Sequence, residues 1–113
     1  MIAQVPAAEF SSWLEAAAAQ GQPVVLDVRE PWELQTASVT PLGFTLLAIP
    51  MNDIPARLAE LDPLQPLACL CHHGARSQRV AHFLAQNGFE NVVNLAGGID
   101  AWSLQRDPAV PRY

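Results

Sequence analysis

The sequence predicts an α/β domain in which helices cover both faces of a mostly parallel sheet. Short apolar runs rich in Val, Ile and Leu recur along the chain, and such runs are typical of strands buried on both faces. Segments of helix formers separate these runs, so strands and helices alternate over the whole length. A parallel strand needs a crossover connection from its predecessor, and a helix supplies one.

The first half of the chain contains two expected strands and two expected helices. Residues 2–5 predict a short edge strand, and residues 7–20 carry strong helix formers that end at Gly21. Residues 23–28, Pro-Val-Val-Leu-Asp-Val, predict a buried strand. Residues 31–35 predict a short helix with proline in its first turn.

The middle of the chain predicts two more apolar runs with a helix between them. Residues 44–49 form the second run, and residues 67–70 form the third buried strand. We expect a helix over residues 54–61, capped by Asn52 or Asp53.

The last part of the chain continues the alternation. Residues 77–86 predict the third substantial helix, and residues 91–95 predict a further strand. A turn at residues 97–98 then leads to a short helix over residues 100–105. Residues 107–113 form a Pro-containing C-terminal tail.

The composition indicates a single domain over residues 1–113. Half of the residues are hydrophobic and 15% are charged, so the chain can bury a real core. The net charge is −5 and no basic run could neutralise phosphates, so we expect no nucleic-acid partner. Residues 44–51 are too short to cross a bilayer, and residues 1–6 lack the features of a signal peptide. We therefore expect a cytoplasmic protein with no membrane partner.

The two cysteines, Cys69 and Cys71, are expected to be free thiols. They lie two residues apart, whereas a disulfide framework needs distant partners. We expect Cys69 to pack in the core, and a bond between the two would be strained.

Residues 71–76, Cys-His-His-Gly-Ala-Arg, lie between the third buried strand and the third helix. A thiol there lies beside N–H groups that the first helical turn leaves without partners. These groups and the helix dipole favour an anion, whether thiolate, persulfide or oxyanion. Ligands in parallel α/β folds bind beyond the carboxyl ends of the strands. The pattern therefore predicts Cys71 as a nucleophile, and an inert buried cysteine is the alternative.

Three segments resemble the rhodanese family of sulfurtransferases in its single-domain form. They are Leu-Asp-Val-Arg-Glu-Pro-Trp-Glu at residues 26–33, the loop at residues 71–77, and Asn-Leu-Ala-Gly-Gly-Ile-Asp-Ala-Trp at residues 94–102. The resemblance implies a three-layer sandwich with a five-stranded, mainly parallel sheet. It also implies that Cys71 takes sulfane sulfur from a donor such as thiosulfate and passes it to a thiophilic acceptor, a small thiol or a protein. We expect no cofactor.

The length of the loop distinguishes related chemistries. The loop from Cys71 to Arg76 has six residues, as in rhodaneses, whereas related phosphatases and arsenate reductases carry one more. The resemblance therefore favours sulfur over a tetrahedral oxyanion. Two alternatives stay open: a sulfur-relay or regulatory module that docks a protein and turns over small donors poorly, and a Cys-based phosphatase or arsenate reductase.

The residues that follow the cysteine are expected to bind the substrate. Gly74 lets the loop curl with positive φ, so that successive N–H groups point inward. Those groups belong to His72, His73, Ala75 and Arg76. Two roles are equally open for Ser77, which can donate its hydroxyl to the sulfur or cap the helix.

The charged residues near the loop are expected to bind the donor or to support the fold. Arg76 is placed to bind a donor's sulfonate or to steady the thiolate, and a structural salt bridge with Asp27 or Glu30 is the alternative. Asp27 and Arg29 match a family motif that is chiefly structural, and we expect a salt-bridge network there.

Metal binding is not expected at the loop. His72, His73, Cys69 and Cys71 are four potential ligands, but adjacent histidines in a tight loop cannot easily converge on one ion. We expect the two histidines to flank the entrance instead.

Residues 37–50 depart from the family pattern. Ala-Ser-Val at residues 37–39 replaces the usual Gly-His-Ile, and several extra residues precede the Ile-Pro that closes the segment. The partner surface near this segment is therefore not predicted. We expect Trp32 and Trp102 to pack in the core or at its rim.

Overall fold

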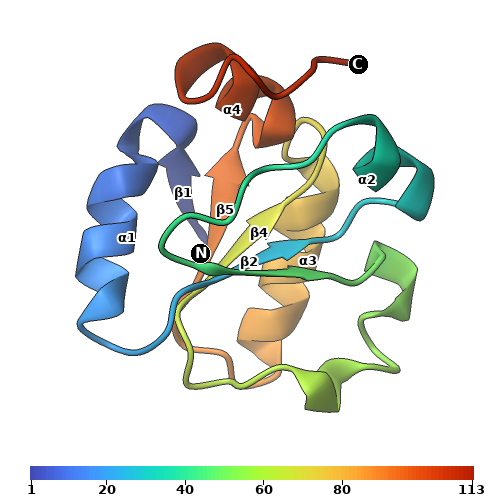
Figure 1. The fold of residues 1–113 in the computed structure, drawn as a ribbon. Coiled ribbons are helices and arrows are strands. Elements are labelled where there is room, and N and C mark those ends of the chain that lie inside the picture. The colour runs from blue at the N-terminus through green and yellow to red at the C-terminus, as the bar shows by residue number, and fades with distance from the viewer.

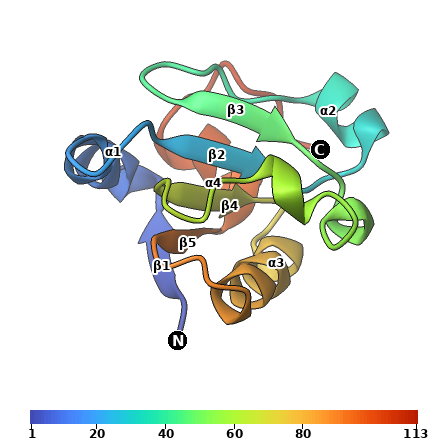
Figure 2. The same cartoon turned by 90° about the horizontal axis from the view of Figure 1, so that it is seen from below.

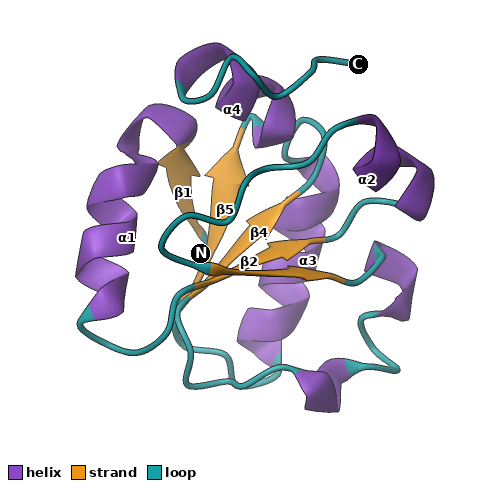
Figure 3. Ribbon diagram, viewed as in Figure 1, coloured by secondary structure: helices purple, strands orange, loops and turns teal.

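The computed structural model describes residues 1–113 and contains a five-stranded sheet in the order β1-β5-β4-β2-β3 (Figure 1). All four strand pairings are parallel. The strands are β1 (Ala3–Pro6), β2 (Val24–Asp27), β3 (Thr45–Ala48), β4 (Leu67–Leu70) and β5 (Val92–Ala96). The predicted α/β sandwich with a parallel sheet is confirmed, and helices and strands alternate along the chain (Figure 3).

Helices cover both faces of the sheet. They are α1 (Phe10–Ala18), α2 (Pro31–Thr36), α3 (Ala75–Gln86) and α4 (Gly98–Gln105). One hydrophobic cluster contains Val80 and Leu84 of α3, and a second contains Phe10 of α1 and Trp102 of α4. Figure 2 shows α3 and α1 on opposite sides of the sheet.

The central strands divide their side chains between these two clusters. In β2, Leu26 belongs to the cluster on the α3 side, while Val25 belongs to the cluster of α1 and α4. In β4, Cys69 faces the α3 side and Leu70 faces the other. Cys71 follows the end of β4 and continues the alternation on the α3 side. Since both faces are buried, these strands show continuous apolar runs in the sequence.

The predicted helix over residues 54–61 is wrong. A 3₁₀ turn, η2 (Met51–Asp53), precedes this segment, and the segment itself contains a second, η3 (Leu58–Glu60). Arg57, between the two, leaves the helical region at φ −111° and ψ 16°. A segment of about eight residues has little helical stability of its own. Packing therefore decides its path, and Ile54 and Leu61 are both buried in the cluster on the α3 side.

The other helices differ from the sequence prediction at their ends. The predicted helix over residues 7–20 divides into a 3₁₀ turn, η1 (Ala7–Glu9), and the shorter α1. Helix α3 begins two residues before the predicted start, at Ala75. Helix α4 begins at Gly98, which the sequence places in a turn.

Residues 37–50 and the C-terminal tail both pack against the rest of the fold. Ala37, Val39 and Phe44 are buried in the cluster of α1 and α4, so the atypical segment contributes to the core. The C-terminal tail is fixed through Val110, which is buried and whose carbonyl accepts a hydrogen bond from Ser103 Oγ at 2.6 Å. Among the helices, none has the length and apolarity to cross a membrane.

Candidate active site

The sulfur of Cys71 lies at the junction between β4 and α3, where a backbone amide and a hydroxyl contact it. The backbone N–H of Gly74 donates to Sγ at 3.1 Å, and Ser77 Oγ lies 3.2 Å from Sγ. Gly74 has φ +109° and occupies the cap position of α3, so the predicted positive φ is confirmed. Only glycine adopts this conformation without strain, and it brings the Gly74 amide back over the cysteine.

The start of α4 is hydrogen-bonded to the loop that carries Cys71. The backbone N–H of Ile99 donates to the carbonyl of Cys71 at 2.9 Å, and that of Asp100 donates to the carbonyl of His72 at 3.2 Å. Gly98 has φ +61°, and a Cβ there would lie 2.5 Å from the Cys71 oxygen. The glycine pair that the sequence places in a turn therefore lets the backbone of α4 approach the backbone of Cys71 closely.

Ser77 belongs to a buried polar network. Its hydroxyl lies 2.5 Å from Asn94 Oδ1 and 3.3 Å from the carbonyl of Gly74. The amide of Asn94 donates to the Gly74 carbonyl at 3.2 Å and to Gln4 Oε1 at 2.9 Å. Ser77 lies within the first turn of α3 and makes no capping bond, since Gly74 holds the cap position. Of the two roles open for Ser77, the structure shows the contact with the sulfur.

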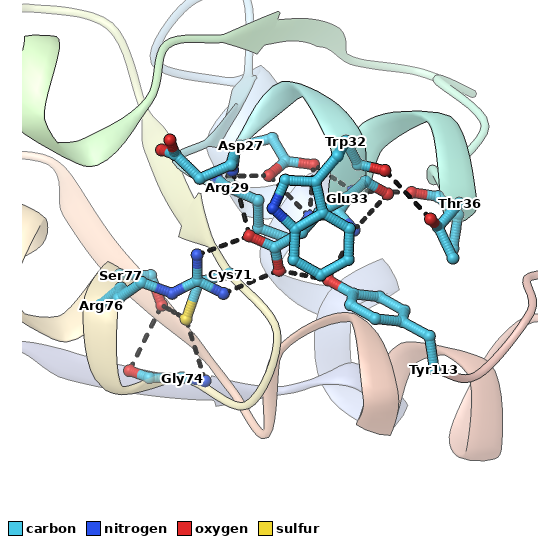
Figure 4. Close-up of polar contacts among 12 residues, drawn as sticks. Asp27, Arg29, Trp32, Glu33, Thr36, Cys71, Gly74, Arg76, Ser77 and Tyr113 are labelled. Carbon is cyan, nitrogen blue, oxygen red and sulfur yellow. Dashed lines mark hydrogen bonds and ion pairs between the residues drawn. The ribbon is translucent and has the colours of Figure 1, made fainter.

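Arg76 pairs with Glu33 of α2. Arg76 Nη1 and Nη2 donate to the two carboxylate oxygens of Glu33 at 2.7 and 2.9 Å, and the hydroxyl of Tyr113 donates to the same carboxylate at 2.7 Å (Figure 4). The prediction that a salt bridge of Arg76 would involve Asp27 or Glu30 is wrong. Glu33 lies on the side of α2 that faces Arg76, whereas Asp27 is already paired with Arg29.

The carboxylate of Glu33 is held strongly in its charged form. Its side chain is 4% exposed, and burial alone would raise its pKa. The hydrogen bond from Arg76 outweighs burial, and with the bond from Tyr113 it lowers the pKa of Glu33 to about 2. Hydrogen bonding to Glu33 in turn raises the pKa of Arg76, to which the nearby charge of Cys71 also contributes.

Asp27 and Arg29 form an ion pair that is almost fully buried. Arg29 Nη2 and Asp27 Oδ2 are 2.7 Å apart, and the two side chains are 0% and 1% exposed. Arg29 also donates to the carbonyls of Ala37 and Glu33 at 2.8 and 3.3 Å and to the Tyr113 hydroxyl at 3.0 Å. This pair joins the end of β2 to α2 and to the C-terminal tail.

The two loop histidines belong to a row of stacked rings. The His72 ring stacks on Tyr113 with centroids 3.9 Å apart and on His73 with centroids 4.0 Å apart. His72 Nε2 also lies 2.8 Å from the main-chain oxygen of Tyr113. Trp32 is 62% exposed and its ring makes a T-shaped pair with that of Tyr113, so it lies at the rim, whereas Trp102 is in the core.

The prediction that Cys69 packs in the core is confirmed. Cys69 is buried in the core, and burial raises the pKa of its thiol. No group of three or more His, Cys, Asp and Glu side chains is arranged to hold a metal ion.

Sequence reasoning missed three residues of the site: Glu33, Asn94 and Tyr113. Glu33 had a usable signal, since it stands two residues after Pro31, where an acid completes a capping box with Glu30. Asn94 is a lone amide within an apolar strand, which also indicates a buried polar contact. Tyr113 had no signal, because the path of the tail decides its place.

Comparisons with known proteins identify the family of this chain. The family model for the Rhodanese-like domain matches residues 10–105. The Rhodanese-like/PpiC domain-containing protein 12, chloroplastic, of Arabidopsis thaliana is 38% identical over 91 residues, which cover 79% of this chain and 30% of that protein. This chain thus spans less than a third of the plant protein.

Two further relatives match over most of both chains. A sulfurtransferase of Allochromatium vinosum is 33% identical over 87 residues, which cover 77% of this chain and 78% of that protein. The crystal structure of a rhodanese-related protein from Thermoplasma volcanium superposes with a TM-score of 0.78 at 31% identity, covering 98% of this chain and 99% of that one.

Proposed function

Because this chain belongs to the family of Rhodanese-like domains, we propose that it is a sulfurtransferase in which Cys71 carries sulfane sulfur as a persulfide. The observation that supports this proposal most directly is the position of Cys71 Sγ at a strand-to-helix junction, where it accepts a hydrogen bond from the Gly74 amide and lies 3.2 Å from the Ser77 hydroxyl. Donors at such a junction stabilise negative charge on sulfur.

In the first half-reaction, the Cys71 thiolate attacks the outer sulfur of a donor such as thiosulfate. A bond forms between Sγ and that sulfur, the sulfur–sulfur bond of the donor breaks, and sulfite leaves with the bonding electron pair. In the second half-reaction, a thiophilic acceptor such as cyanide or a thiol attacks the outer sulfur of the persulfide, and the Cys71 thiolate is released. No external oxidant or reductant is consumed.

The residues around the sulfur have distinct roles in this proposal. The amide of Gly74 and the hydroxyl of Ser77 stabilise the thiolate and the persulfide anion. The backbone groups of His72, His73, Ala75 and Arg76 complete the wall that binds the transferred sulfur. Asp27 and Arg29 support the loop from the end of β2. Two free cysteines fit a reducing compartment such as the cytoplasm.

Access to the sulfur requires side chains to move. Cys71 is 1% exposed and lines none of the surface cavities. A donor therefore reaches Sγ only after its neighbours shift. A second candidate function is a sulfur-relay module whose partner protein opens the site on docking. The burial of the sulfur favours it, as do the exposed Trp32 and the stacked rings of Tyr113 and His72, the residue after Cys71.

Intact mass spectrometry after thiosulfate treatment tests the proposed function. We expect a mass gain of about 32 Da, the mass of one sulfur atom, which is lost when cyanide is added. Cys71→Ser should abolish the gain, and Cys69→Ala, the matched control, should retain it, because Cys69 is buried away from the loop. A gain that persists in Cys71→Ser would contradict the assignment. A relay module would instead gain sulfur only from a partner protein. An aryl phosphatase activity that depends on Cys71 would contradict both sulfur-transfer functions.

A further inference from the structure

The positive charge nearest to Cys71 is neutralised within the protein. Arg76 is near enough to Cys71 for the two charges to interact, but both of its terminal nitrogens are bound to Glu33. Arg29 is likewise paired with Asp27. The next arginine of α3, Arg79, stands one helical turn farther from the loop. The sulfur therefore faces a neutral ion pair and not a free cation.

Glu33 is fixed in this position by more than the arginine. Its carboxylate accepts hydrogen bonds from the Tyr113 hydroxyl and from the backbone N–H of Glu30 at the start of α2. Its side chain is 4% exposed, so water does not compete well for these bonds. An anionic donor that recruits Arg76 must displace a buried carboxylate that accepts two other hydrogen bonds, or bind beside it.

We propose that Glu33 determines donor specificity by holding Arg76 in this pair, so that the site favours sulfane donors with at most one negative charge at the reacting end over the dianion thiosulfate. Thiosulfonates and persulfides have such an end. This inference rests on the proposed function, and it adds the substrate class. The Glu33 carboxylate repels each extra negative charge on the donor, and the guanidinium of Arg76 is not free to pair with that charge.

Two donors that differ mainly by one charge test the inference. Thiosulfate carries two negative charges, and methanethiosulfonate has a methyl group in place of one charged oxygen. The Cys71 thiolate attacks the outer sulfur of either donor. The sulfur–sulfur bond breaks, and sulfite leaves from the first donor and methanesulfinate from the second, each with the bonding pair. The same persulfide forms in both reactions.

The experiment compares kcat/KM for these two donors in the wild type, in Glu33→Gln and in the control Glu30→Gln. Glutamine at position 33 keeps the capping position and can still contact Arg76, so the fold is expected to persist. In Glu33→Gln, the preference for methanethiosulfonate over thiosulfate should fall at least about tenfold, chiefly through faster use of thiosulfate. Glu30→Gln removes a charge from the same helix end and should leave the preference unchanged.

A second measurement needs no variant. If the ion pair is neutral, kcat/KM of the wild type for thiosulfate should not fall as ionic strength rises from about 0.01 to about 0.15 M, because no attractive field is screened. A steep fall with salt, or an unchanged donor preference in Glu33→Gln, would overturn the inference while leaving the sulfurtransferase proposal intact. If neither donor adds sulfur to Cys71, the proposed function itself fails.

Discussion

Replacing Asp27 with asparagine should destabilise the protein severely, because it leaves the buried Arg29 guanidinium without its counter-ion. The five N–H donors of Arg29 find acceptors on Asp27, on two backbone carbonyls and on the Tyr113 hydroxyl. Asparagine has nearly the same shape as aspartate, so no cavity forms and the loss reports mainly on charge. Removing one partner of a buried ion pair costs about 3–5 kcal/mol.

The assay is urea denaturation of Asp27→Asn against wild type, followed by far-ultraviolet circular dichroism. Domains have a total stability of roughly 5–15 kcal/mol, so the variant is expected to retain only part of it. At about 4 °C per kcal/mol for a domain of this size, the melting temperature should fall by roughly 12–20 °C.

The control for this experiment is Asp53→Asn, which changes an exposed carboxylate and should leave the transition nearly unchanged. A loss below about 1 kcal/mol in Asp27→Asn would refute the reasoning, since it would mean that the Arg29 charge is stabilised without the carboxylate.

The charge of Glu33, the backbone contact at Gly98 and the hydroxyl of Ser77 can each be tested by one substitution. Glu33 has a lowered pKa in the folded state, so its charge stabilises the fold fully above about pH 4.5, and this contribution is lost as the pH falls toward about 2. The shift from 4.5 to about 2 corresponds to roughly 3 kcal/mol. Urea titrations should therefore show that Glu33→Gln lowers the free energy of unfolding less at low pH than at neutral pH. An equal loss at both pH values would contradict the charge argument. Gly98→Ala should destabilise the protein by about 1–3 kcal/mol more than Gly88→Ala. Both glycines have positive φ, but of the two only Gly98 would place a Cβ against backbone atoms. Equal melting temperatures of the two variants would show that the loop shifts to accept the Cβ. Ser77→Ala should slow sulfur loading of Cys71 roughly three- to tenfold in a mass-spectrometric time course, as expected for one lost hydrogen bond, and an unchanged rate would remove Ser77 from the mechanism.

The sequence predicted the sheet well because the buried strands carry their own signal. Residues 67–70 match β4 to the residue, since an apolar run bounded by a proline and a glycine-containing loop has few other interpretations. The predicted helix over residues 54–61 was wrong because the apolar spacing there suits a helix as well as the separate 3₁₀ turns η2 and η3. The choice depends on contacts of Ile54 and Leu61 with residues distant in sequence.

The candidate site shows the same division. Cys71 and Gly74 were predictable, because a strand-to-helix junction imposes its own geometry on a short loop. The partner of Arg76 could not be predicted, because three carboxylates lie within residues 27–33 and only the orientation of α2 selects Glu33. The contacts of Tyr113 depend on the route of the whole C-terminal tail, which no local pattern encodes.

The alternation of side chains along β4 makes the position of the reactive sulfur a property of strand pairing. Cys71 points to the α3 side because it stands an even number of residues from Leu67 and Cys69, which pack there. A single inserted or deleted residue within Leu67–Leu70 would turn the sulfur toward the helices on the opposite face. Evolution of this chain can therefore change the composition of the strand far more readily than its length.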